Sequence, residues 1–259
     1  MAKIENLRKE IEKYLDKYLP SEKSFPPILH KAMRYSVFSG GKRLRPLIIL
    51  LVGEILGIDK KKLMPFACGI ELIHNFSLIH DDLPSMDNDD YRRGKLTCHK
   101  KFGEDIAILA GDALIALGFK LISETDCVPL IKFVADAIGS EGMAGGQVLD
   151  MVYKNRKIDK KTKKEIDEKK TGKLFEVCFL GPCFFKKIRK EKKKLLEKIA
   201  KNFGIAFQIR DDIEDKEGNI EELKKKLNSI YRKLKKDIEF FGKKGLYLSC
   251  LVDKLYKIY

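Results

Sequence analysis

The sequence predicts an all-α fold, and three observations support that prediction. Apolar residues recur three and four positions apart along nearly the whole chain, which is the period of an amphipathic helix. No run of alternating apolar and polar residues is long enough to support a sheet. The 259 residues are enough to bury one large core, and no repeat or low-complexity linker divides them. We therefore expect a single domain over residues 1–259, a helical bundle whose core helices surround a central cavity.

Glycine and proline residues separate the predicted helices, since each stops one helix before the next begins. In order, the helices cover residues 3–19, 27–38, 43–57, 60–82, 104–124, 128–144, 160–180, 190–215, 220–241 and 244–258. The breaks fall at Pro20, Pro26, Pro27, Gly40, Gly41, Pro84, Gly94, Gly103, Gly181 and Pro182. Pro84 disfavours helical geometry at Leu83, so the fourth helix ends near Asp82. Gly218 is a stop signal just beyond the helix at 190–215.

Hydropathy and cysteine usage predict a soluble, cytoplasmic protein. The longest uninterrupted apolar run is Leu47 to Val52, so we expect no transmembrane helix and no stable membrane insertion. The first 17 residues carry charges of both signs and lack the apolar core of a signal peptide. The six cysteines form no CxxC pair and fall mostly in apolar periodic segments, which favours packed, reduced thiols over a disulfide or zinc framework.

The net charge of +15 raises the possibility of a nucleic-acid-binding protein. The excess lies in three Lys-rich stretches, at 154–170, 186–201 and 224–236. In each of them lysine alternates with Leu, Ile and Glu at helical spacing, which is typical of a solvated helix face. No nucleic-acid motif accompanies them. We therefore expect no nucleic-acid partner, although a positive field would attract a small anion such as a diphosphate.

A first acidic cluster follows the predicted helix at 60–82. Residues 81–90 contain five aspartates, and Arg92 and Arg93 come directly after them. Asp81 and Asp82 would lie at a helix C-terminus, where the macrodipole is already negative. Such a cluster needs cations beside it, and hard oxygen ligands suit Mg²⁺.

A second acidic cluster lies at the end of the predicted helix at 190–215. Asp211 and Asp215 are four residues apart and share a face, with Asp212 between them. If the two helix ends face each other, the carboxylates can hold metal ions between them. Mg²⁺ completes its shell with water and phosphate oxygens, so clusters without histidine ligands indicate a phosphorylated substrate. The alternative is that both clusters are solvated helix ends.

A Gly-Gly turn carries a third group of charges. Gly40 and Gly41 are followed by Lys42, Arg43 and Arg45 at a predicted helix start. Main-chain amides, the positive helix end and these cations would together bind phosphate. The glycine spacing excludes a Walker A loop. Taken alone, the stretch is a weak signal and favours a surface turn.

These pieces, in this order, resemble the trans-isoprenyl diphosphate synthases, specifically the short-chain farnesyl or geranylgeranyl diphosphate synthases of the bacterial type. The resemblance covers about residues 35–216. It rests on SGGKRLRP at 39–46, ELIHNFSLIHDDLPSMDNDDYRRG at 71–94, LAGD at 109–112, GGQVLD at 145–150, KTGK at 170–173 and FQIRDD at 207–212. It implies the all-α isoprenoid synthase fold, a homodimer, and Mg²⁺ as cofactor, with three ions bound together with diphosphate.

The resemblance also implies a role for each matching residue. The metal-binding residues would be Asp81, Asp82 and Asp87 in the first cluster and Asp211, Asp212 and Asp215 in the second. The diphosphate of isopentenyl diphosphate would be held by Lys42, Arg45, His74 and Arg93. Arg92 and Lys170 would hold the allylic diphosphate, and Thr171 and Gln208 would line the path of the allylic cation. We take Arg92, Lys170, Thr171 and Gln208 as the catalytic set.

In this family an allylic C–O bond ionises, and the double bond of isopentenyl diphosphate attacks the resulting cation. Phe76 lies five residues before Asp81, about 7.5 Å lower along a helix. Its resemblance to the aromatic residue of bacterial farnesyl synthases makes Phe76, with Ser77, the candidate for setting product length at C15. An ordinary core phenylalanine is the alternative.

Other residues have simpler interpretations. His80 is expected to make a local hydrogen bond, because Mg²⁺ prefers oxygen ligands. Asp112 is expected to be a buried structural carboxylate, while Gln147 and Asp150 are either supporting or packing residues. His30 and His99 receive no role.

The chain departs from the family after Asp215. The family continues through a loop that donates a lysine to the allylic diphosphate and helps to close the site. Here residues 216–219 lead straight into a Lys-rich helix, so we expect that loop to be absent and the C-terminal region after residue 216 to be short. Lys216, Lys224 and Lys225 are candidate substitutes.

Several functions compete. The first is a prenyltransferase that condenses isopentenyl diphosphate with an allylic diphosphate such as the dimethylallyl or geranyl compound. The second is a catalytically weak or regulatory subunit of a heteromeric synthase, which the missing loop favours and the retained aspartates oppose. A terpene cyclase fits less well, because the Lys42 and Arg45 site serves a second diphosphate. A nucleic-acid binder comes last.

Overall fold

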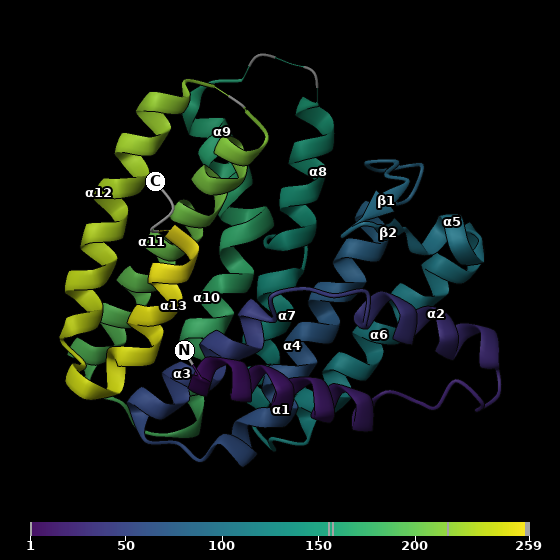
Figure 1. Ribbon diagram of the computed structural model, residues 1–259, viewed down its shortest axis with the longest axis horizontal. Coiled ribbons are helices and arrows are strands. Elements are labelled where there is room, and N and C mark those ends of the chain that lie inside the picture. The colour runs from purple at the N-terminus through teal and green to yellow at the C-terminus, as the bar shows by residue number, and fades with distance from the viewer. Residues whose placement is uncertain (1, 155, 157, 217, 257–259) are drawn as a thin grey trace. The chain divides into compact units, whose positions relative to one another are not determined.

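The computed structural model describes residues 2–154, 156, 158–216 and 218–256, and this part of the chain is almost entirely helical (Figure 1). It forms two compact units. The N unit comprises Glu5–Leu47 and Lys61–Asp126, and the C unit comprises Met1–Ile4, Ile48–Lys60 and Cys127–Tyr259. The all-α prediction is confirmed, whereas the single domain around one cavity stays a prediction.

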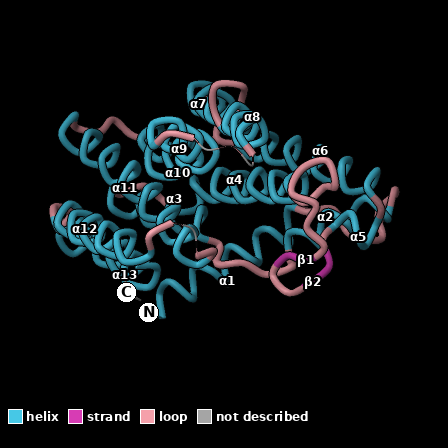
Figure 2. Tube along the Cα trace, turned by 90° about the horizontal axis from the view of Figure 1, so that it is seen from above, coloured by secondary structure: helices cyan, strands magenta, loops and turns pink. Residues whose placement is uncertain are grey.

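The N unit contains most of the first helices and a short hairpin. Its elements are α1 (Ala2–Tyr18), α2 (Pro27–Val37), the start of α3 (Leu44–Leu56), α4 (Lys60–Asp81), β1 (Tyr91–Arg92), β2 (Lys95–Leu96), α5 (Cys98–Phe102) and α6 (Glu104–Ser123). The strands pair antiparallel, with Tyr91 opposite Leu96. Helix α2 packs against α5 and α6, as Figure 2 also shows.

Helix α4 carries the first acidic cluster, and the periodicity of its apolar residues explains its position. Leu63, Phe66, Ile70 and Ile73 are all fully buried, as the three-and-four spacing predicts. A Cβ on Gly69 would lie 2.7 Å from the Gly118 carbonyl oxygen of α6. The two helices therefore meet at a pair of glycines, and this close packing fixes the axis along which α4 carries its aspartates.

The C unit is built around one long helix. Its elements are the rest of α3, α7 (Val128–Ile138), α8 (Met143–Tyr153), α9 (Lys160–Asp167), the π-helix η1 (Glu168–Gly172), α10 (Lys173–Leu180), the 3₁₀-helix η2 (Gly181–Phe185), α11 (Lys190–Glu214), α12 (Ile220–Glu239), the 3₁₀-helix η3 (Gly242–Gly245) and α13 (Leu246–Tyr256). Helix α11 packs against η1, α10 and α12. Its Phe203 lies 5.0 Å from Phe175 and 5.4 Å from Phe179, measured between ring centroids.

The elements differ from the prediction most clearly at two places. The helix expected over 128–144 ends at Ile138 and a new helix, α8, begins at Met143. The break needs glycine, because a Cβ on Gly142 would lie 2.1 Å from the Ala137 carbonyl oxygen. The hairpin and the five-residue α5 are too short to leave a periodic signal. The last helix is described to Tyr256, so the end expected at residues 257–258 lies outside the described residues.

One helix bears on the membrane prediction. Helix α6 is long and apolar enough to cross a membrane by length and composition, with a mean hydropathy of 1.9, and 39% of it is buried. The sequence prediction counted only uninterrupted apolar runs and therefore passed over it. A core helix of a globular protein meets the same two criteria. The cysteines agree with the prediction, since all six are free thiols, with Cys68, Cys98 and Cys178 buried.

Candidate active site

The first acidic cluster lies where α4 ends, as predicted. The helix stops at Asp81, and the chain then folds back so that the Asp87 amide donates to the Asp81 carbonyl oxygen at 2.9 Å. The Asn88 amide donates to the Leu83 carbonyl oxygen at 3.1 Å, with Asn88 at a φ of +56°. This turn brings Asp81 and Asp87 to the same helix end, although they are six residues apart in sequence.

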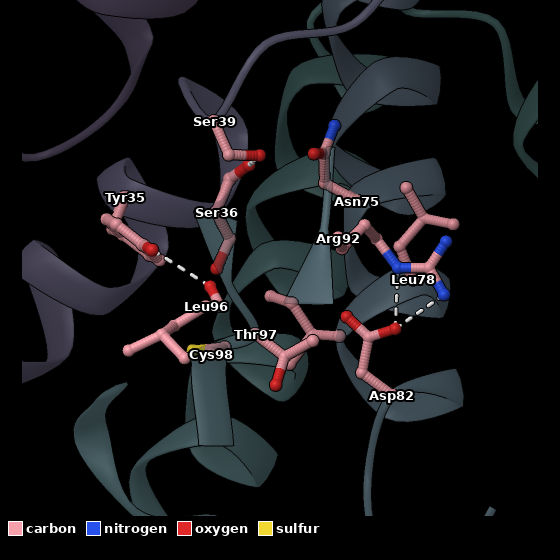
Figure 3. Close-up of a pocket in the computed structure, with 11 residues that line it drawn as sticks. Tyr35, Ser36, Ser39, Asn75, Leu78, Asp82, Arg92, Leu96, Thr97 and Cys98 are labelled. Atoms are coloured by element: carbon pink, nitrogen blue, oxygen red, sulfur yellow. Dashed lines mark hydrogen bonds and ion pairs between the residues drawn. The ribbon is translucent and has the colours of Figure 1, made fainter. Parts of the chain in front are cut away.

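Asp82 has a different environment from Asp81. Its carboxylate is buried, and both Nε and Nη2 of Arg92 lie 2.5 Å from its Oδ1 (Figure 3). Arg92 also pairs with Asp89 at 3.2 Å. Burial raises the pKa of Asp82, and the Arg92 guanidinium opposes that shift. Asp82 therefore orients Arg92 in this structure.

A small pocket lies beside this ion pair. It has a volume of about 30 Å³ and is lined by residues of α2, α4 and the hairpin, among them Ser36, Asn75 and Thr97 (Figure 3). The Thr97 hydroxyl donates to the Asp89 carbonyl oxygen at 2.8 Å and contacts His99 Nδ1 at 3.1 Å. Thr97 thus holds the loop that follows the first cluster, a role that no sequence pattern indicated.

The Gly-Gly turn corrects one part of the sequence interpretation. Arg43 does not point to a phosphate site, because its guanidinium is 2% exposed and bonds Glu12 at 2.8 Å and Glu71 at 2.9 Å. It also donates to the Val37 carbonyl oxygen at 2.6 Å. Arg43 therefore anchors the turn to α1 and α4. Neither glutamate could be identified from local sequence, since they lie 31 residues before and 28 residues after it.

The remaining cations of the turn are accessible. Lys42 is exposed and Arg45 is half-buried. Gly40 and Gly41 have φ values of 110° and 124°, which only glycine adopts easily. The Arg93 guanidinium lies directly over this turn, because it donates to the Gly40 carbonyl oxygen and a Cβ on Gly41 would come within 2.7 Å of its Nη1. The N unit thus gathers Lys42, Arg45 and Arg93 around one turn.

His74 lies among these cations. Burial lowers the pKa of its imidazole well below the usual range, and Arg45, Arg93 and Arg92 lower it further. The imidazole is therefore neutral at pH 7 and offers one N–H donor. A neutral histidine surrounded by arginines can donate to an anion that the arginines attract.

His80 and Asp112 test two of the simpler predictions. His80 Nε2 lies 3.1 Å from the Ile108 carbonyl oxygen, which can only accept, so this nitrogen carries the proton and is not a metal ligand. The hydrogen bond is present, but it joins His80 to α6, 28 residues away in sequence, and is therefore not local as predicted. Asp112 was expected to be buried, and that prediction was wrong: its side chain is 60% exposed, 3.9 Å from His80 Nε2. The His80 ring packs against Gly111, the residue before Asp112. Because Gly111 makes this contact, the Asp112 side chain turns outward.

Phe76 and Ser77 lie one turn below the first cluster. The Phe76 ring is half-buried and packs edge-on against His80 at 5.1 Å between centroids. The Ser77 hydroxyl donates to the His74 carbonyl oxygen at 2.9 Å. Phe76 is thus not one of the fully buried core aromatic residues, unlike Phe66 on the same helix.

The second acidic cluster ends α11 in the C unit. Burial raises the pKa of Asp211 to about 6; Arg210 opposes the shift, and Glu214, Asp215 and Asp212 add to it. Asp215 is exposed and caps the helix, its amide donating to the Asp211 carbonyl oxygen at 2.9 Å. Burial and neighbouring carboxylates oppose the ionisation of Asp211, so a bound cation would stabilise its charged form.

A series of hydrogen bonds links three predicted site residues to a lysine that the sequence analysis did not select. The Thr171 hydroxyl donates to Gln208 Oε1 at 3.4 Å, and Gln208 Nε2 donates to Asp212 Oδ1 at 3.2 Å. Lys163 Nζ lies 3.3 Å from the same Asp212 oxygen. Lys163 belongs to the stretch at 154–170 that was interpreted as a solvated face; its side chain is 44% exposed, and its ammonium group nevertheless contacts Asp212. Residues 155 and 157 of that stretch lie outside the described residues.

Lys170 and Thr171 lie in η1, a π-helical turn of the kind that is frequent at functional sites. Lys170 Nζ donates to Asp150 Oδ2 at 2.6 Å. A Cβ on Gly146 would come within 2.4 Å of the Lys170 amide nitrogen, so the GGQ segment must have glycine there for α8 to approach. Asp150, which the sequence left open, therefore supports Lys170.

A wide groove opens beside the second cluster. It has a volume of about 1060 Å³ and runs between α9, η1 and α10 on one side and α12 on the other, over one face of α11. The connection from α11 to α12 is as short as predicted: Asp215 caps one helix and Asn219 caps the next, its Oδ1 accepting from the Glu222 amide at 3.2 Å. Residue 217 lies outside the described residues. Among the proposed substitute lysines, Lys224 pairs with Glu221 at 3.5 Å.

Both clusters offer the donors that Mg²⁺ prefers. Among the described residues no three His, Cys, Asp or Glu side chains converge as a ready metal cage. Mg²⁺ does not need one, because it keeps several waters and takes one or two carboxylates together with substrate phosphates. Asp81 and Asp87 at one helix end, and Asp211 at the other, fit that requirement.

Comparison with known proteins gives consistent results. The polyprenyl synthetase family matches residues 26–233. A farnesyl diphosphate synthase from Bacillus subtilis is 44% identical over 231 residues, which are 86% of this chain and 77% of the relative. One from Micrococcus luteus is 42% identical over 223 residues, 84% of this chain and 75% of the relative.

Solved structures are also similar. An FPP/GFPP synthase from Zymomonas mobilis, in its apo form, matches with a TM-score of 0.92 and 32% identity over 98% of each chain. A geranyltranstransferase from Thermotoga maritima matches with a TM-score of 0.86 and 33% identity, over 97% of this chain and 98% of the other.

Proposed function

Because this chain belongs to the polyprenyl synthetase family, we propose that it is a short-chain prenyltransferase that condenses isopentenyl diphosphate with an allylic diphosphate and releases pyrophosphate. The observation that carries the proposal is the Arg93 guanidinium over the Gly40–Gly41 turn, in the same unit as the helix that bears His74 and ends in the Asp81 cluster. Fixed cations and one neutral donor, next to carboxylates that suit Mg²⁺, are the parts that a diphosphate site needs.

Each half of the site has a distinct task in this proposal. Lys42, Arg45, His74 and Arg93 bind the diphosphate of isopentenyl diphosphate. Arg92 and Lys170 bind the allylic diphosphate, the first held by Asp82 and the second by Asp150. Because both cations are already paired with a carboxylate, their positions are set before substrate arrives, which lowers the entropic cost of binding.

Asp81 and Asp87, with Asp82 behind them, and Asp211, with Asp212 and Asp215, would hold three Mg²⁺ ions together with the diphosphate. Bound there, Mg²⁺ would neutralise the negative charge that develops on the leaving diphosphate. The prenyl synthases of this family are generally Mg²⁺-dependent. The number of ions is part of the proposal.

The reaction then needs little covalent chemistry from the protein. The C–O bond of the allylic diphosphate breaks, and the electron pair leaves with pyrophosphate. Arg92 and Lys170 stabilise the added charge where it develops. The Thr171 hydroxyl and the Gln208 side chain, which bond each other at 3.4 Å, face the allylic cation with oxygen atoms. The double bond of isopentenyl diphosphate attacks that cation, and the departing pyrophosphate takes the proton that is lost.

Product length is the finer part of the proposal. Phe76, with Ser77 beside it, would close the path of the growing chain below the first cluster and limit the product to C15, farnesyl diphosphate. The half-buried position of Phe76 supports this role, because a ring in the closed core would not meet a substrate. The farnesyl diphosphate synthases among its relatives support the same product.

The proposal includes a homodimer in the cytoplasm, without nucleic acid and without stable membrane insertion. Ile108 and Leu109 of α6 are 43% and 53% exposed, and an apolar helix face of this kind is suited to a subunit contact. In sedimentation, the unsubstituted protein should have twice the chain mass, and the Leu109→Glu protein should have the mass of one chain. These two results would support a homodimer.

The direct test is incubation of the purified protein with Mg²⁺, geranyl diphosphate and labelled isopentenyl diphosphate. Labelled farnesyl diphosphate and pyrophosphate are the expected products. A protein that forms neither, but stimulates a separate synthase, would instead be the regulatory subunit considered above.

A further inference from the structure

Lys163 lies against the second acidic cluster, although it belongs to a different helix. Its Nζ is 3.3 Å from Asp212 Oδ1, and the two residues are 49 positions apart in sequence. The Asp212 side chain is 9% exposed, whereas that of Lys163 is 44% exposed. A buried carboxylate thus meets an ammonium group whose flexible stem reaches in from the solvent side.

The contact has consequences for residues beyond Asp212. The same carboxylate oxygen also accepts from Gln208 Nε2, and Gln208 accepts from Thr171. Lys163 therefore stands at one end of a series of bonds whose other end is a residue of the proposed catalytic set. Removing the ammonium charge changes the electrostatics of the whole series.

The surroundings of Lys163 are strongly charged. Asp211, Asp215 and Glu214 lie beside Asp212 on α11, and the carboxylate of Asp167 lies one turn after Lys163 on α9. Lys226 of α12 also acts on Asp167 from across the groove. Five residues, 215–219, connect α11 to α12, which forms one wall of this groove.

We propose that Lys163 is a movable counter-ion of the second acidic cluster, which neutralises Asp212 before metal binds and pairs with the diphosphate after metal has bound. This rests on the proposed function. A divalent cation at the cluster would repel the ammonium group from Asp212, and a metal-bound diphosphate would offer that group a new anionic partner. The half-exposed stem permits that change without any movement of the backbone.

The test uses the full-length protein and two binding measurements. Mn²⁺ binding in the absence of substrate is measured by calorimetry, and inorganic pyrophosphate binding is measured at saturating Mn²⁺. We expect Lys163→Gln to bind Mn²⁺ about threefold to fivefold more tightly, because a competing cation is lost. The same protein should bind pyrophosphate more weakly by a similar factor. Changes of this size are typical of a partly exposed ion pair. Lys163→Arg keeps the charge and should retain both affinities.

Lys164→Gln is the matched control, since Lys164 is the next residue, carries the same charge and pairs with Glu168 instead. It should change neither affinity. A Lys163→Gln protein that binds both ligands more weakly has lost a structural contact, and that result overturns the inference. Unchanged affinities also overturn it. If the unsubstituted protein binds neither Mn²⁺ nor pyrophosphate, the proposed function itself fails.

Discussion

The two acidic helix ends look alike in sequence but differ in where their cations come from. At the end of α4, Asp82 pairs with Arg92, which lies ten residues later in the same loop. At the end of α11, Asp211 pairs with the adjacent Arg210 at 3.5 Å, and Asp212 pairs with Lys163, which lies 49 residues earlier on another helix. The ion pairs of Asp82 thus lie within one short segment, whereas the second cluster also depends on how the C unit folds.

The carboxylates themselves also differ. Arg92 contacts both Asp82 and Asp89, so the first cluster enters the site with much of its charge already balanced. At the second cluster, burial and neighbouring carboxylates raise the pKa of Asp211 to about 6. We infer that the first end mainly presents an oriented arginine to the substrate, and that the second end mainly presents a buried carboxylate to a metal ion.

The strongest test of this comparison removes one carboxylate from each end. We expect Asp81→Asn and Asp211→Asn each to lower kcat by about 100-fold to 1000-fold, the cost of losing one preorganised charge-stabilising contact. The measurement is farnesyl diphosphate formation at saturating substrates and Mg²⁺. Removal of Mg²⁺ with a chelator should abolish activity in the unsubstituted protein.

Asp105→Asn, at the exposed start of α6, is the matched control and should retain activity. If Asp211→Asn proved as active as this control, only the first helix end would bind metal. The comparison between two metal-binding ends would then be wrong.

The second prediction concerns the Asp82 and Arg92 pair. Arg92→Gln should lower kcat/KM for the allylic diphosphate by about 10-fold to 100-fold, because a charge-assisted contact is lost. Asp82→Asn should cost less. The double variant should be no worse than Arg92→Gln alone, since residues that act as one unit are not additive. Fully additive effects in this cycle would mean that Asp82 acts on the metal and not through Arg92.

The same contrast explains how much of the fold could be predicted from sequence. The long helices were predictable because burial of one face imposes a period of 3.6, as at Leu63, Phe66 and Ile70. The break between α7 and α8 was not, because it depends on the contact between Gly142 and the Ala137 carbonyl. The hairpin at 91–96 was also missed, since two-residue strands contain no alternation to detect.

The candidate site follows the same rule. Residues within contiguous motifs, such as Asp81, His74 and Gln208, could be selected from sequence through their resemblance to a family. Their supports could not be, because Glu12, Glu71 and Lys163 each lie at least 28 residues from the group they contact. Arg43 is an example, because its sequence position beside a glycine turn suggested one more phosphate-binding cation. In the structure it is buried between two glutamates that are distant in sequence.

The third prediction uses pH to separate the two ends. Because the pKa of Asp211 is raised to about 6, this group is protonated below pH 6 and must lose its proton before it binds metal. We expect Mn²⁺ affinity to be about tenfold weaker at pH 5 than at pH 7, as one competing proton requires. Asp211→Asn should remove this change of Mn²⁺ affinity between pH 5 and pH 7. Any weaker pH dependence that arises from the first acidic cluster should remain. A profile that Asp211→Asn does not alter would assign the titration to another carboxylate.

The smallest expected effect on turnover concerns the aromatic residues beneath each cluster. Phe76 on α4 is half-buried and contacts His80, whereas Phe203 on α11 is fully buried in an aromatic cluster, 5.0 Å from Phe175. We expect Phe76→Ala to give products longer than C15 with total turnover within about threefold, because it removes bulk from the chain path and no charge. Phe203→Leu keeps an apolar side chain within the packed core and should leave product length unchanged. Chromatography of the dephosphorylated products distinguishes these outcomes. If the Phe76→Ala protein makes only the C15 product, Phe76 does not limit the length of the chain.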